Sequence, residues 1–416
     1  MKLCSLIIAL VLSASFSQAM DLAGMQAMAL NNREVIQQYI TNFEQSEKEI
    51  VRAKGGYYPS VDLAYTTNSL NENTLLENKN NSIVQGKISM NLFAGFRDKY
   101  GLQSAQILQE VEQFKLQGIR QDIQLNVALA YLAVFERRAN RAVAESAFQT
   151  LGKIYKDGES RFQVGLIGKN ELLKFRVDYD NADITSKTAD AGLKKSIIDL
   201  SRQVGSEVTL ADLDFADFDN LPPLVDRGVY VDKMLAERSE IKAMEAAIGA
   251  TSAQVEAAKS GFYPRLDAVG SYQRYNDDLL NGSGSISDEQ WRAQLVVSMN
   301  LFQGNTTEAT IAKTRLQARA QKYELQELKH NLVNDLDNLF IDLQVSLENV
   351  LVAKRSIEQA EENLRITQLK YDEGLQRESD LLDAITSLSR AKYNYVAVMR
   401  TVFTNHFSLT RMIGGF

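Results

Sequence analysis

The residue types that most often do chemistry are few in this chain and lie far apart in the sequence. The two histidines, His330 and His406, have no metal-binding residue three or four positions further on. Ser389 and Lys392 have the spacing of a catalytic Ser-Lys pair, but on a surface helix this spacing is a common coincidence. The run 165–169 has two glycines and a lysine, without the spacing or the preceding strand of a P-loop. These residues predict no activated nucleophile or water, no enzyme activity and no cofactor.

One pair of acidic residues does have a defined spacing. Asp380 and Asp383 are three positions apart, which places both carboxylates on one face of a helix. Taken alone, Asp380 is a first-turn helix acid and Asp383 a solvated surface residue, because acids stabilise helix N-termini. What the pair does therefore depends on the elements that carry it.

The N-terminal segment has the pattern of a secretory signal peptide, predicted over residues 1–19. Lys2 supplies the positive start, Leu3 to Phe16 the apolar stretch, and 17–19 a small-x-small cleavage site. A retained anchor helix is the alternative, but the apolar run is shorter than the ~20 residues that a spanning helix needs. The only cysteine, Cys4, lies in this segment, so we expect a mature chain without disulfides or a cysteine metal site.

The chain contains an internal tandem duplication. AKGGYYPSVD at 53–62 recurs 205 residues later as AKSGFYPRLD at 258–267. SMNLFAG at 89–95 returns 209 residues later as SMNLFQG at 298–304. The register changes once, by four residues, so the insertion is expected in a tolerant loop near Gly282-Ser283-Gly284. Internal repeats indicate that each copy is one structural unit.

The duplication predicts two structural repeats, 20–224 and 225–416, joined by an Asp-rich linker that contains Pro222-Pro223. Each repeat is expected to consist of a helix, a β-hairpin, a long helix, a tight turn and a returning helix. The hairpins are predicted at 60–93 and 264–302, and the tight turns near residues 165 and 374.

Long helices are predicted because the chain has only four prolines, none of them inside the long helical stretches. The first helices are expected at 22–55 and 230–260, each stopped by glycine shortly before a Tyr-Pro pair. From about 305 to 370 a heptad pattern predicts a helix of roughly 100 Å at 1.5 Å per residue. Asn170 and Ser379 are expected as the N-caps of the returning helices.

The hairpins alternate apolar and polar residues, which predicts one apolar and one polar face. The apolar positions are Val61, Leu63, Tyr65 and Thr67, then Val84, Ile88, Met90 and Leu92, and in the last strand Trp291, Ala293, Leu295, Val297, Met299 and Leu301. Each strand has about the 10 residues that a tilted membrane strand needs, and a soluble sheet with one buried face is the alternative. Four strands cannot close a barrel, and open edges are excluded from lipid, so other copies must complete the sheet.

Together these motifs resemble the TolC-like outer-membrane efflux and secretion channels over essentially the whole mature chain. The most specific pieces are YPSVD and YPRLD, the paired NLF-x-G motifs, and KYDEGLQRESDLLDAITSLSRAKYNY at 370–395. The resemblance implies a mainly α fold with membrane β: a homotrimer with a 12-stranded β-barrel, four strands per protomer, that continues into a long α-helical coiled-coil barrel. It also implies an outer-membrane location that extends into the periplasm of a Gram-negative cell, contact with outer membrane lipid, and two kinds of partner. These are a periplasmic adaptor of the membrane fusion type and an inner-membrane ABC or RND-type pump.

The resemblance also assigns roles to residues near the two tight turns. It places the adaptor-docking tip at Arg161, Val164, Gly165, Leu166, Gly374 and Leu375. It places Asp380 and Asp383 in a constriction, where three copies would collect six carboxylates, with Tyr371 as a gate residue and Asn170 and Glu171 as its polar partners. The family's gating arginine is replaced by Gln376, which puts a charged latch of the usual kind in doubt.

A soluble periplasmic coiled-coil scaffold or adaptor is the alternative function. The formal net charge of -7 argues against a nucleic-acid partner. The substrate, a secreted protein or small molecules such as drugs, stays open, and the lack of a lipid-accepting cysteine leans toward the branch that also serves type I secretion.

Overall fold

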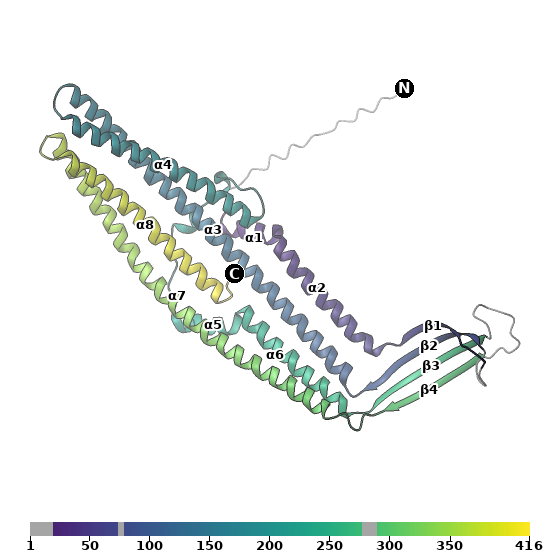
Figure 1. Ribbon diagram of the computed structural model, residues 1–416. Helices are drawn as coiled ribbons and strands as arrows, with labels where there is room; N and C mark the ends of the chain where they lie inside the picture. Colours follow the sequence, from purple (N-terminus) through teal and green to yellow (C-terminus); the bar gives the residue numbers. More distant parts are fainter. Residues whose placement is uncertain (1–19, 74–78, 277–288) are drawn as a thin grey trace, which may run out of the picture. The chain divides into compact units, whose positions relative to one another are not determined.

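The computed structural model describes residues 20–73, 79–276 and 289–416. The predicted signal peptide and the glycine-rich loop at 282–284, where the four-residue insertion was expected, lie outside the described residues. The chain is mainly helical with one four-stranded sheet, as the sequence predicts (Figure 1). Within the described ranges, no helix is both long and apolar enough to cross a membrane.

The two repeats have the same order of elements. The first contains α1 (Leu22–Asn32), α2 (Glu34–Lys54), β1 (Ser60–Ser69), β2 (Asn80–Ala94), α3 (Arg97–Gln163) and α4 (Lys169–Val204). The second contains α5 (Arg227–Glu237), α6 (Ser239–Ala258), β3 (Arg265–Asn276), β4 (Glu289–Ser298), α7 (Thr306–Asp372) and α8 (Glu378–Met412). Helices α3 and α7 each have 67 residues and start and end at repeat-equivalent positions.

The first helix of each repeat is broken, where the sequence predicted one continuous helix. Arg33 separates α1 from α2 with an extended backbone, φ -79 and ψ 118. Arg238 separates α5 from α6 in the same way, with φ -65 and ψ 124. Arg33 donates a hydrogen bond from Nη1 to the carbonyl of Arg202, at 2.6 Å, at the end of α4. The break at Arg33 thus coincides with a tertiary contact that helix periodicity does not reveal.

The chain forms two compact units, each with segments from both repeats. The helix-turn unit comprises Met1–Glu34, Arg120–Met234 and Val333–Phe416. The sheet unit comprises Val35–Ile119 and Leu235–Leu332.

In the sheet unit, the strands lie in the order β1-β2-β3-β4 and all pairs are antiparallel. The registers Tyr65↔Val84 and Tyr272↔Trp291 put the predicted apolar positions on one face. Strand β4 ends at Ser298, whereas the sequence predicted a hairpin to 302. The equivalent part of β2 continues to Ala94 because β3 pairs with it, and the residues after Ser298 have no such neighbour among the described residues.

In the helix-turn unit, α7 buries the predicted heptad seam. Leu336, Leu343 and Val350 are among its most buried residues. The segment between the repeats is more than a linker, because Phe215 and Phe218 pack against the ring of Tyr131. The hydroxyl of Tyr131 donates to the carbonyl of Asp214, and burial raises the pKa of Tyr131 above its usual range. The Tyr131 hydroxyl also lies within hydrogen-bond distance of the Met20 carbonyl, so this aromatic cluster ties Met20 and the inter-repeat segment to α3.

Candidate functional site at the helix turns

The turns that join α3 to α4 and α7 to α8 have the same backbone geometry. Gly165 and Gly374 have φ values of 76 and 74, which lie in the left-handed region that glycine adopts without steric cost. In the first turn, Gly165 N–H donates to the Phe162 carbonyl at 3.0 Å and Leu166 N–H to the Arg161 carbonyl at 2.9 Å. The second turn repeats both bonds. This pattern ends a helix with its last carbonyls satisfied.

The turns carry apolar side chains that no described part of the chain covers. Val164, Leu166 and Leu375 are 71%, 74% and 72% exposed. Exposed apolar residues that cluster on a surface often mark an interaction site. These are three of the residues that the sequence comparison with the channel family placed at the docking tip.

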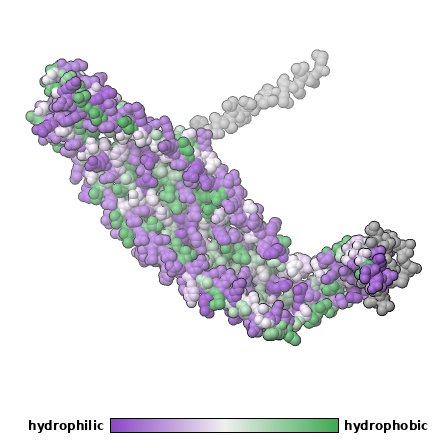
Figure 2. Space-filling model, viewed as in Figure 1, coloured by the Kyte–Doolittle hydropathy of each residue, from purple (hydrophilic) through white to green (hydrophobic). Residues whose placement is uncertain are grey.

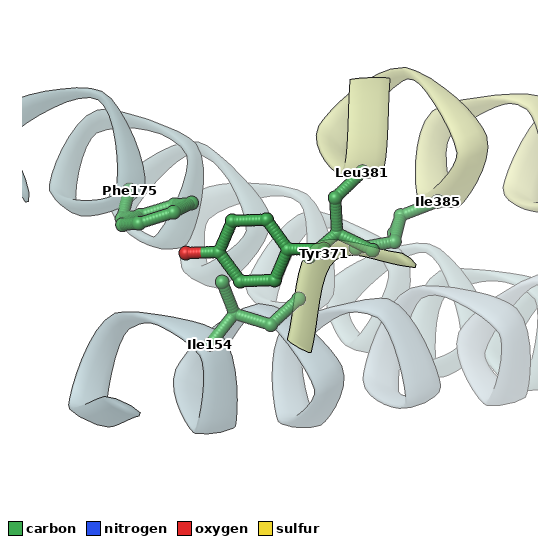
Figure 3. Packing of buried hydrophobic residues seen from close by; sticks show 5 residues of the cluster. All are labelled: Ile154, Phe175, Tyr371, Leu381 and Ile385. Atoms are coloured by element: carbon green, nitrogen blue, oxygen red, sulfur yellow. The ribbon is translucent and has the colours of Figure 1, made fainter. Parts of the chain in front are cut away.

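Behind the turns, Tyr371 lies in a buried cluster that joins the two repeats (Figure 3). Its neighbours are Ile154 and Phe175 from the first repeat and Leu381 and Ile385 from the second. The rings of Tyr371 and Phe175 meet edge to face, with centroids 6.4 Å apart. Burial raises the pKa of Tyr371 and outweighs the nearby Arg161 charge, which lowers it.

Two ion pairs link the repeats beside this cluster. Arg161 Nη2 lies 3.5 Å from Asp372 Oδ1, and its guanidinium carbon lies 5.0 Å from the centre of the Tyr371 ring. Lys174 Nζ lies 2.9 Å from Glu378 Oε1, and this hydrogen bond holds the pKa of Glu378 below its usual range. The sequence did not predict the Lys174 contact, because lysines on exposed helices are common and only spatial proximity singles one out.

The two predicted polar partners of Tyr371 make no hydrogen bond to it in the described part of the chain. Glu171 accepts a hydrogen bond at 3.1 Å from the backbone N–H of Gly168, so it caps its own helix. Asn170 is exposed at the second helical position and is not the N-cap, which is Gly168. In the second repeat the cap is likewise Arg377 and not Ser379. The charge of Glu171 still contributes to the raised pKa of Tyr371, which places the two residues in one neighbourhood.

The predicted constriction acids lie in the first turns of α8. Gln376 Nε2 donates to Asp380 Oδ2 at 2.8 Å, so the residue at the family's arginine position binds an acid of its own repeat. Asp383 is exposed. A third acid, Asp178 on α4, has its pKa raised by burial and then by the charge of Asp383. Asp178 was missed from the sequence, because its partner lies 205 residues away.

The histidine and the Ser-Lys pair named in the sequence analysis form no catalytic group in the described part of the chain. Lys392 pairs with Glu361 at 3.0 Å, which ties the amine of the Ser-Lys spacing to a carboxylate. Burial lowers the pKa of His406, so its imidazole is held neutral. Across the parts of the chain that the structure describes, no three His, Cys, Asp or Glu residues are grouped to hold a metal ion.

Comparison with known proteins identifies similar sequences. Residues 230–415 match the family model described as outer membrane efflux protein. The outer membrane protein TolC of Escherichia coli strain K12 is 21% identical over 434 residues, which cover 99% of this chain and 86% of that protein. The alkaline protease secretion protein AprF of Pseudomonas aeruginosa is 21% identical over 305 residues, which cover 70% of this chain and 62% of that protein.

Solved structures share the fold. The outer-membrane channel OprN has a TM-score of 0.81 at 17% identity, over 95% of this chain and 90% of that chain. The outer membrane protein VceC of Vibrio cholerae has a TM-score of 0.78 at 17% identity, over 95% of this chain and 96% of that chain. The predicted combination of long helices with a four-stranded sheet is thus confirmed as an architecture that occurs in channel proteins.

Proposed function

We propose that this chain, whose residues 230–415 match the family model described as outer membrane efflux protein, is a member of that family and the outer-membrane duct of an efflux or type I secretion system. The duct lies in the outer membrane of a Gram-negative cell and extends into the periplasm. It passes substrates to the exterior from an inner-membrane pump of the ABC or RND type and a periplasmic adaptor. Similarity to a TolC and to a protease secretion protein supports both kinds of transport.

The apolar face of the sheet is the observation that carries this proposal. Leu63, Trp291 and Leu295 are 81%, 79% and 73% exposed, all on one face of the strands. Figure 2 shows apolar residues on the surface of the strands close to the helices. Leaving such side chains in water costs about 1.5–3 kcal/mol each relative to full burial, whereas lipid tails accept them. A soluble sheet would bury this face against another layer.

The repeat indicates how copies of the chain close the sheet. If three chains form a ring of six similar repeats, every contact from first to second repeat recurs between the second repeat and the first repeat of the next chain. The observed pairing Met90↔Ala268 then becomes Met299 opposite Leu63 of the partner subunit. Met299 is 52% exposed and lies just beyond the end of β4. We expect β4 to lengthen on assembly, which gives a 12-stranded barrel without open edges.

The same repeat register predicts which helices of neighbouring chains contact each other. Arg400 of α8 pairs with Glu136 of α3 at 2.8 Å. The equivalent contact between chains brings Val345 of α7 beside Ala191 of the partner subunit, and both residues are exposed. Exposed apolar residues flank these positions: Ile184 and Ile198 on α4, Ile341 and Val352 on α7. Their spacing, mostly in steps of seven or four, suits side-by-side helix packing.

Within this duct we propose that the helix turns form the adaptor-docking tip, because Val164, Leu166 and Leu375 are exposed apolar residues around two rigid turns. Asp380 and Asp383 line the constriction of the trimer. The Tyr371 cluster, with Gln376, Asn170 and Glu171 around it, holds the two helical hairpins of each chain together behind that constriction.

Cell fractionation tests the proposal. The protein should be found in the outer membrane, require detergent for extraction, and have a protein mass of three chains by light scattering. A monomer recovered from periplasmic extract without detergent would contradict the duct and favour the soluble scaffold.

A further inference from the structure

Asp383 and Lys169 are both exposed charges at the helix-turn end. Among the residues that the structure describes, Asp383 has no cation and Lys169 no carboxylate within ion-pair distance. The charge of Asp383 instead contributes to the raised pKa of a second acid, Asp178 on α4. The two negative charges repel each other, so a cation beside Asp383 would offset that repulsion.

The observed ion pair between the repeats supplies the geometry. Lys174 of α4 binds Glu378 of α8 at 2.9 Å. By the register of 209 residues that relates α3 and α4 to α7 and α8, Lys174 is equivalent to Asp383, and Lys169 to Glu378. Exchange of the repeats therefore turns the observed pair into a contact between Asp383 and Lys169, again a carboxylate and an amine.

We infer that Asp383 forms an ion pair with Lys169 of the partner subunit. This inference rests on the proposed ring of three chains, because only a ring brings the second repeat of one chain against the first repeat of the next. Both contacts then join an α4 lysine to an α8 acid. Each α8 is held on one side by Lys174 of its own chain and on the other by Lys169 of the partner subunit.

The proposed ion pair gives the two constriction acids different roles. Asp380 accepts a hydrogen bond from the neutral amide of Gln376, and no lysine or arginine among the described residues forms an ion pair with it. Asp383 has its charge balanced by the neighbouring lysine. Substitution D380N should therefore reduce cation selectivity more than D383N, whereas D383N should weaken the contact between subunits more than D380N.

Cysteine cross-linking of the full chain in detergent tests the pair. Cys4 is the only native cysteine, so with Cys4→Ser the introduced thiols are the ones that react. A short bismaleimide suits side chains whose backbones are more than about 7 Å apart, beyond disulfide reach. The variant K169C/D383C should give covalent dimers and trimers on a denaturing gel. The matched variant K174C/E378C should react within one chain and keep the monomer mass.

Lys187 provides the control, because it is an exposed α4 lysine that binds Asp183 of its own helix. The variant K187C/D383C should stay monomeric on the gel. A three-chain mass by light scattering together with monomers only from K169C/D383C would overturn the pair and leave the duct intact. A single-chain mass would overturn both.

A charge exchange gives a second readout. The single change K169D should lower the temperature at which the trimer dissociates in detergent, and K169D/D383K should recover most of that loss. Equal losses in the single and double variants would overturn the inference.

Discussion

The role of Tyr371 can be decided by comparing two substitutions. The side chain is 7% exposed and its ring contacts residues of both repeats, but its hydroxyl has no hydrogen-bond partner in the described part of the chain. Removing the ring by Tyr371→Ala should cost about 3–5 kcal/mol of local packing. That is more than a hundredfold in the ratio of packed to loosened helix-turn ends.

Tyr371→Phe keeps the ring, the edge contact with Phe175 and the position beneath the Arg161 guanidinium. It should cost less than the roughly 1 kcal/mol that a typical hydrogen bond contributes. Single-channel recordings in planar bilayers should show a higher open-state occupancy or conductance for Tyr371→Ala and wild-type behaviour for Tyr371→Phe. If Tyr371→Phe opened the channel as far as Tyr371→Ala, closure would depend on the hydroxyl and the packing argument would be refuted.

Three further changes have defined outcomes. Asp380→Ala with Asp383→Ala should lower cation selectivity and weaken block by polyvalent cations, and unchanged selectivity in bilayer recordings would remove both residues from the constriction. Burial raises the pKa of Asp178, so the folded state binds the proton more tightly than the unfolded state and stability falls as pH rises through the raised pKa. Asp178→Asn should raise the melting temperature at neutral pH and make it less dependent on pH above the ordinary carboxyl pKa, and an unchanged pH profile would contradict this. Gly374→Ala should destabilise the turn by about 1–2 kcal/mol because its φ is 74, measured as a lower melting temperature, whereas Gly168→Ala, at a negative φ, should cost less because it loses only the preference for glycine at a helix N-cap.

The large features of the fold could be predicted from the sequence because they have local causes. The lack of proline permits long helices, and the glycines at 165 and 374 stop them with a left-handed residue. Alternating residues in the hairpins identify the strands and their apolar face. The duplication then fixes the order of elements twice, which makes each assignment a check on the other.

The element boundaries that were predicted wrongly depend on contacts with residues distant in the sequence. The break at Arg33 coincides with its bond to the end of α4, and β4 stops at Ser298, beyond which no strand of the described residues lies beside it. Asn170 and Ser379 are good cap residues by type, but each helix begins two residues earlier than such a cap would allow. Residue preference ranks candidates for a cap, and the turn geometry selects among them.

In the candidate site, too, residues with a local role could be predicted and residues with distant partners could not. The turn glycines and the neighbouring apolar residues could be found in the sequence because a turn needs them together. Lys174 and Asp178 could not, since charged residues on helix surfaces are frequent and their partners lie in the other repeat. One sequence signal did exist: Glu171 and Lys174 of the first repeat stand where the second has Asp380 and Asp383.

Ion conduction by the purified protein tests the central claim most directly. Added to one side of a planar lipid bilayer, a preparation with a mass of three chains should produce discrete, cation-selective current steps. Trimers that insert but carry no current, or protein that never leaves the aqueous phase, would contradict the proposal that this chain forms a duct through the outer membrane.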